Sequence, residues 1–148
     1  MNSNDRAIDN PKHCLNANLR KASRAITKLY VSALADTGLQ GTQFTLLSTI
    51  SGYKDCTITE LARYLVMDQT TVTRSVEKLR QRGYVEVFTG EDRRERILRL
   101  TSEGERIVQV TYPKWRDVQT RVWKQLGSEK AHQLLELIDE IVELSEDV

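Results

Sequence analysis

The chain's 148 residues are 39% hydrophobic and 29% charged with a formal net charge of +1, a composition typical of one folded, helix-rich domain rather than a disordered chain. No stretch approaches the ~18 consecutive apolar residues of a membrane span, and the first thirty residues lack the apolar core of a signal peptide, so we expect a cytoplasmic protein without membrane contact. The two cysteines, Cys14 and Cys56, exclude a disulfide framework and a four-thiolate zinc site, and we predict no metal and no cofactor.

Charge is unevenly spread along the chain. Residues 1–30 contain six basic and two acidic side chains, residues 74–99 contain eight and five, and residues 129–148 contain one and seven. Such a chain can present a basic face to a polyanion and keep its acidic end remote, although ordinary solvated faces also produce runs of this kind.

Three helices are predicted in the first half of the chain. Residues 1–12 are polar and are expected to form an arm. Apolar residues then recur at three- and four-residue spacing until Gly38, which predicts a helix of about twenty residues. A short helix capped by Thr42 follows. Thr57 and Glu60 form a capping box for a third helix of about two turns.

The next segment predicts a helix-turn-helix. Val66, Met67 and Asp68 form a turn, Asp68 caps a helix over residues 69–82, and Gly83 ends it. At about 100° per residue, one face of this helix is apolar and the opposite face is polar and partly cationic. The apolar face contains Val72, Val76 and Leu79, and the polar face contains Thr70, Arg74, Glu77 and Gln81.

Two β-prone runs, residues 84–89 and 96–101, flank a polar loop and predict a hairpin. The register that opposes Thr89 and Arg96 gathers apolar residues on one side and brings Glu86 opposite Arg99 as an ion pair on the other. The apolar side pairs Val87 with Leu98 and Val85 with Leu100.

Two helices are predicted after the hairpin. Ser102 and Glu105 form a capping box that opens a long helix, in which Pro113 should cause a bend. The last helix follows Gly127 and Ser128, and its apolar residues cover about half of its circumference, more than the ~100° stripe that one core face needs. This helix therefore requires a second partner.

A helix-turn-helix followed by a hairpin with arginines in its loop is a winged helix, whose commonest use is binding duplex DNA, since a helix fits the major groove and a cationic loop fits the minor groove. The stretches ITELARYL, TTVTRSVEKLRQRGYVE and GEDRRERILRLTSEG resemble the MarR family of bacterial regulators. The family's wing pattern is matched at Asp92, Arg94, Leu100, Thr101 and Gly104.

The resemblance implies a mainly α fold with a small β-hairpin wing (α+β) in a single domain, residues 1–148. Residues 42–101 would form the winged helix-turn-helix lobe that binds DNA, and residues 13–37 and 102–148 would form a helical dimerisation region. Two chains would then bind a pseudo-palindromic operator in double-stranded DNA as a homodimeric repressor.

The DNA contacts of the family carry over onto the predicted recognition helix and wing. Three of these residues have an alternative role without DNA contact. Thr71 would be a helix cap, Lys78 a solvated charge and Asp92 a neutralising neighbour of the arginines. The expected helix contacts are Gln69, Thr70, Thr71, Thr73, Arg74 and Lys78, and the wing contributes Arg93 and Arg94, with Asp92 as its internal anchor.

Two ways of sensing a signal follow from the resemblance. In the first, a small aromatic anionic ligand binds between the first two helices and the helix after the wing; core filling is the alternative role for these residues. In the second, an oxidant modifies Cys14, where a helix N-terminus favours thiolate, and an inert thiol is the alternative. The residues assigned to the ligand are Arg24, Tyr30, Phe44, Tyr112 and Trp115.

Other classes of function fit the sequence less well. Because the chain has no glycine-rich phosphate loop and no nucleophile elbow, we predict that it is not an enzyme. A winged helix that contacts only proteins is the alternative, but that role would not need Thr70, Arg74 and two adjacent wing arginines on one surface.

Overall fold

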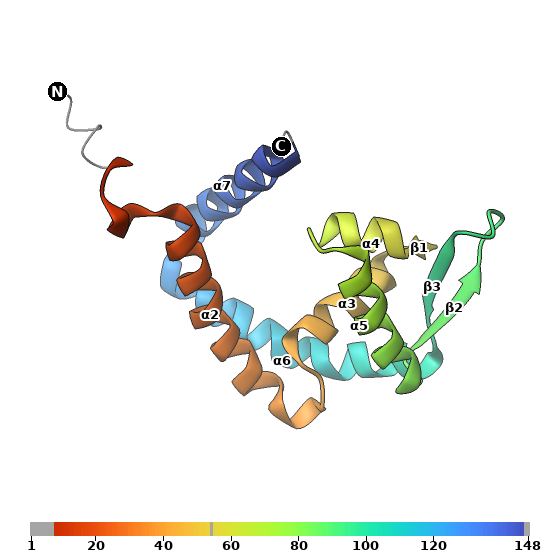
Figure 1. Cartoon of the computed structure of the whole chain (residues 1–148). Coiled ribbons are helices and arrows are strands. Elements are labelled where there is room, and N and C mark those ends of the chain that lie inside the picture. The colour runs from red at the N-terminus through yellow and green to blue at the C-terminus, as the bar shows by residue number, and fades with distance from the viewer. Residues whose placement is uncertain (1–7, 54, 147–148) are drawn as a thin grey trace.

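The computed structural model describes residues 8–53 and 55–146, so residues 1–7 of the expected arm lie outside the described residues. Figure 1 shows α6 spanning the molecule, with α3, α4, α5 and the strands at one end and α2 and α7 at the other. The elements in chain order are η1 (Pro11–His13), α2 (Leu15–Leu34), η2 (Ala35–Thr37), α3 (Gly41–Gly52), β1 (Cys56–Thr57), α4 (Ile58–Tyr64), α5 (Gln69–Gln81), β2 (Val85–Thr89), β3 (Arg96–Leu100), α6 (Ser102–Leu126) and α7 (Ser128–Glu146).

Residues 41–100, which we call the winged lobe, form most of a continuous apolar core, to which Leu34, Leu39 and Ile107 also belong. The antiparallel sheet has the order β1-β3-β2, and the β2–β3 register is the one predicted from the sequence. The short strand β1, which the sequence did not reveal, places Cys56 opposite Leu98. Both side chains are fully buried. The mainly helical fold with a small sheet is thus confirmed, with one strand more than the predicted hairpin.

Several local predictions are confirmed and others are wrong. Thr57 and Glu60 form the expected capping box. The cap of α3 is Gln40 rather than Thr42, because Gln40 exchanges hydrogen bonds with Gln43. At the start of α6 the cap is Thr101 rather than Ser102, and its hydroxyl accepts the Gly104 N–H at 3.0 Å.

The predicted ion pair between Glu86 and Arg99 is also wrong. The two residues lie opposite each other in the hairpin, as expected. The Arg99 guanidinium instead binds Asp55, just before β1, with Nη2 2.5 Å from Oδ1, and it lies over the Phe88 ring. The segment that leads into β1 therefore supplies the carboxylate, which the hairpin sequence alone could not reveal.

The first turn of α6 lies directly against the start of the wing. The Thr101 N–H donates to the Tyr84 carbonyl oxygen at 3.1 Å. A Cβ atom on Gly104 would lie 2.0 Å from that same oxygen, well inside van der Waals contact. Glycine at this position thus lets α6 approach the backbone that leads into β2, which fixes the wing relative to α6.

The remaining helices pack on α6 but leave apolar side chains uncovered. The Tyr30 hydroxyl of α2 donates to Gln119 of α6, and the Trp123 ring of α6 meets the His132 ring of α7 edge-on. Helix α6 continues through Pro113. No helix in the described part of the chain is long and apolar enough to cross a membrane.

Candidate nucleic-acid interface

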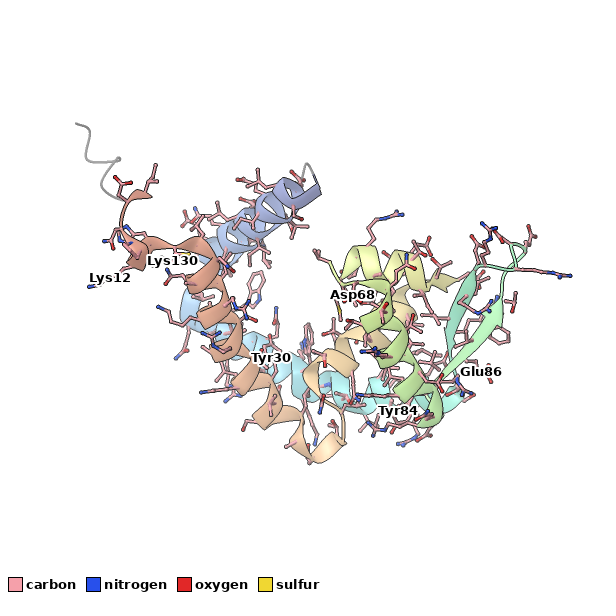
Figure 2. The ribbon with its side chains drawn as sticks, viewed as in Figure 1. Lys12, Tyr30, Asp68, Tyr84, Glu86 and Lys130 are labelled. Carbon is pink, nitrogen blue, oxygen red and sulfur yellow. The ribbon has the colours of Figure 1, made fainter. Side chains whose placement is uncertain are left out.

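Helix α5 is the second helix of the helix-turn-helix, and its start is fixed by Asp68. The Asp68 carboxylate accepts the Thr71 N–H at 2.8 Å and the Thr71 hydroxyl at 2.5 Å. These two bonds, the hydroxyl bond first, hold the pKa of Asp68 below its usual value. Figure 2 shows Asp68 at the beginning of α5. Thr71 is therefore bonded, through its backbone and its hydroxyl, to the residue that caps the helix.

The inner face of α5 packs into the core, as predicted, through Val72, Val76 and Leu79. The outer face is exposed, and two of its members bond locally: the Thr73 hydroxyl donates to the Gln69 carbonyl at 2.7 Å, and Gln69 Nε2 donates to the Thr59 hydroxyl at 3.4 Å.

Three further side chains of this face make no such bonds within the described part of the chain. Within residues 8–53 and 55–146, no hydrogen bond or ion pair occupies the side chain of Thr70, Arg74 or Lys78. These donors are free to meet a ligand.

Glu77, the acidic residue of α5, does not pair with Arg74 or Lys78. The Glu77 carboxylate binds Arg80, with Arg80 Nη2 2.8 Å from Oε1, and also accepts the Gln81 amide at 3.2 Å. The bond from Arg80 is the main reason why the pKa of Glu77 is lowered. Glu77 is thus paired along its own helix, which leaves Arg74 and Lys78 as the uncompensated charges.

The wing loop is organised by Asp92. Its carboxylate accepts the Arg94 N–H at 2.9 Å, and its carbonyl accepts the Glu95 N–H at 2.9 Å. The Gly90 N–H donates to the Glu95 carbonyl at 3.1 Å and closes the loop. Arg93 and Arg94 lie exposed on this loop. The carboxylate of Asp92 thus anchors a turn that presents two arginines.

Part of the predicted ligand-binding set lies together in a cavity of about 610 Å³ between α3, α4 and α6. Phe44, Tyr112 and Trp115 line it, and the Tyr112 and Trp115 rings stack at 5.6 Å. Arg24 and Tyr30 belong to α2 and do not line it. Figure 2 shows Tyr30 on α2, where it faces α6.

Sequence reasoning missed two aromatic residues of the cavity, Tyr53 and Tyr64, whose rings meet edge-on at 6.3 Å. Each follows or ends a short helix, a position where an aromatic residue carries no periodic signal. Among the described residues that line the cavity none is charged, and the Ser48 hydroxyl is buried there with no hydrogen-bond partner.

The two cysteines have opposite environments. Cys14 is exposed at the N-cap of α2, whereas burial, followed by the nearby Glu60 charge, raises the pKa of Cys56 to about 11. Among the described residues no cluster of His, Cys, Asp and Glu is suited to holding a metal ion.

This fold and this face define a winged helix-turn-helix protein. Residues 37–95 match the family model described as "MarR family". The transcriptional regulator MosR of M. tuberculosis, solved in complex with DNA, is 33% identical, covers 90% of this chain and 97% of its own, and superposes with a TM-score of 0.82. The chain belongs to the MarR family, whose members are transcription regulators and not enzymes.

Two further relatives are more limited in what they support. The HTH-type transcriptional regulator YwoH of Bacillus subtilis is 32% identical over 88 residues, and the match spans 60% of this chain and 64% of YwoH. BpsR of Bordetella bronchiseptica, solved in a study of its regulation by 6-hydroxynicotinic acid, is 20% identical with a TM-score of 0.80 and covers 89% of this chain and 95% of its own. The BpsR likeness supports the fold alone.

Proposed function

We propose that this protein is a homodimeric, sequence-specific DNA-binding repressor that leaves a pseudo-palindromic operator when a small ligand or an oxidant acts on it. The observation that carries the proposal is the outer face of α5, where Thr70, Arg74 and Lys78 are exposed and have no side-chain partner among the described residues, next to a wing that presents two arginines. MosR, the relative with 33% identity, is found in complex with DNA.

Distinct roles follow for the residues of this face. Thr70 and Arg74 read base edges in the major groove, whereas Arg94 enters the minor groove and senses its negative potential. Lys78 and Arg93 bind phosphates, and Asp92 keeps the wing loop in shape. Gln69 and Thr73 contact the DNA from the first two turns of α5. Thr71 contributes through the cap of the helix.

A homodimer is supported by the apolar faces of residues 13–37 and 102–148. Five large apolar side chains of α2 and six of α7 are exposed, a larger apolar surface than monomers usually tolerate. A second copy of the same chain would cover these faces and place two copies of α5 about one DNA turn apart, or a small multiple of that distance. Residues 42–101 would then form the DNA-binding part.

Two substitutions test the DNA-binding role, measured by fluorescence anisotropy on duplexes recovered by binding-site selection from random sequence. Arg74→Ala should relax base preference at one position per half-site by about 1–3 kcal/mol. Arg94→Ala should weaken binding to most selected duplexes and flatten the salt dependence. Wild-type affinity and selectivity in both variants would contradict the proposal. A winged helix that contacts only proteins would bind none of the duplexes.

The cavity between α3, α4 and α6 favours release by an aromatic ligand. Its five aromatic rings offer stacking surfaces, and the buried Ser48 hydroxyl, which has no hydrogen-bond partner among the described residues, offers one more polar contact. A cation for an anionic ligand is missing from the described lining residues, so we expect salicylamide to release operator DNA at lower concentration than salicylate. Release only by an organic hydroperoxide, and its loss in Cys14→Ser, would favour the thiol instead.

A further inference from the structure

A hollow of about 520 Å³ separates the wing from the helix-turn-helix. It is lined from three sides, by α4, by the first turns of α5 and by the wing loop with the start of β3. Figure 1 shows the tip of the wing and α4 on the same side of the winged lobe. Three arginines line the hollow: Arg63 from α4, Arg94 from the loop and Arg96 from β3. Neither Arg63 nor Arg96 was among the sequence-predicted site residues.

Of the two carboxylates in this hollow, that of Glu60 is held by hydrogen bonds within the chain. Glu60 accepts the Thr57 N–H at 2.8 Å and the Thr57 hydroxyl at 2.9 Å. The Glu95 carboxylate lies beside Gly90, since an added Cβ on that glycine would be 2.7 Å from Oε2. The three guanidinium groups therefore outnumber the two carboxylates, one of which is already bonded to Thr57.

The arginines also differ in how firmly they are positioned. Arg96 Nη1 donates to the Arg93 carbonyl at 3.0 Å and to the Glu95 carbonyl at 3.5 Å, which fixes its guanidinium against the wing loop. Arg63 is exposed, and no hydrogen bond of the described residues occupies its side chain. The Thr59 hydroxyl accepts from Gln69 and so keeps its own O–H to donate. Donors thus surround the hollow on all three sides.

We infer that this hollow binds the sugar-phosphate backbone that separates the two grooves of the operator, with Arg63 and Arg96 as its phosphate ligands. The inference rests on the proposed function: if α5 occupies the major groove and the wing occupies the adjacent minor groove, one DNA strand must pass between them. A phosphodiester needs charge-assisted donors, which the arginines supply in a fixed, forked geometry. These contacts set the register of the protein on DNA without reading sequence.

The test uses the full-length protein and a duplex recovered by binding-site selection, prepared with one neutral methylphosphonate at each backbone position around a half-site in turn. Wild-type protein should lose about tenfold in affinity or more when a phosphate at the boundary between the two grooves is neutralised, because each contact involves a charged donor. Arg63→Ala should bind the native and the neutralised duplex equally at one of these positions. It should also reduce the salt slope by about two, since a dimer contributes two copies.

Two further variants act as controls. Arg63→Lys keeps the charge and should retain most of the salt slope, and Arg116→Ala removes an exposed arginine in the middle of α6 and should bind as wild type. A wild-type salt slope and wild-type methylphosphonate sensitivity in Arg63→Ala would overturn the phosphate site while leaving the proposed function standing. Failure of the wild-type protein to bind any selected duplex would overturn both.

Discussion

The winged lobe closes its own core, whereas α2 and α7 leave theirs open. In the lobe, Leu47, Leu61, Leu79 and Leu98 are fully buried by neighbours from the same chain. Helix α7 is also rich in apolar residues, yet six of its large apolar side chains are between 36% and 67% exposed. Among the described residues of α7, Ala131 is the one buried apolar residue. Figure 1 shows α7 projecting from the end of α6, apart from the lobe.

This difference shows that similar apolar stripes have different consequences in the two regions. In the lobe, α3, α4, α5 and the sheet enclose each other, so stability is a property of one chain. In α2 and α7, the same kind of stripe becomes useful only when another surface covers it. Helix α6 connects both regions, since its Ile107 belongs to the lobe core and its Trp123 contacts α7.

The largest expected effect comes from opening the lobe core. Leu61→Ala removes a fully buried side chain from α4 and leaves a cavity, which should lower the free energy of unfolding by about 2–5 kcal/mol. Urea denaturation followed by circular dichroism measures this loss, and it should be the same at every protein concentration. A loss below about 1 kcal/mol would mean that the lobe core is not closed as described.

A charge on α7 should act differently, through association. Ile138→Arg places a cation in the middle of the apolar face and should convert the proposed dimer into monomers at micromolar concentration, because each dimer would then have to bury two charged side chains without counter-ions. Sedimentation equilibrium measures the change. Glu136→Arg, on the polar face of the same helix, is the matched control and should remain dimeric. Equal behaviour of the two variants would contradict the contrast between the regions.

The smallest effect uses the two cysteines, one in each region. Cys56 lies in the lobe core, and burial raises the pKa of its thiol to about 11, so at mildly alkaline pH it stays protonated and shielded. Cys14 is exposed on the helical side. Iodoacetamide followed by peptide mass spectrometry should therefore find Cys14 alkylated and Cys56 unmodified. Comparable alkylation of both in native protein would show that the lobe opens readily.

Much of the fold could be predicted because local signals agreed with tertiary packing. Asp68 is a good capping residue, and the apolar stripe of α5 follows it, so α5 was placed correctly. The hairpin register followed from apolar pairing on one face. Strand β1 could not be found in this way, because two residues are too few to show alternation.

The errors arose where long-range contacts decide between local options. Gln40 has a weaker capping preference than Thr42, but its partner Gln43 completes a reciprocal pair of bonds. Arg99 forms its ion pair with Asp55, which is distant in sequence. Val66, in the turn before α5, has φ 52°, and a β-branched residue gives no sequence signal for that left-handed conformation. The cavity between α3, α4 and α6 was predicted only in part, because Tyr53 and Tyr64 reach it from helix ends.

The most direct test of a dimeric, sequence-reading repressor is sedimentation velocity of the protein with a fluorescent duplex obtained by binding-site selection, in the presence of unlabelled random-sequence duplex as competitor. The account predicts a complex of two chains on each selected duplex, which at least a ~10³-fold excess of random-sequence duplex is needed to displace. Displacement by an equal amount of random duplex, or a complex that contains a single chain, would contradict it.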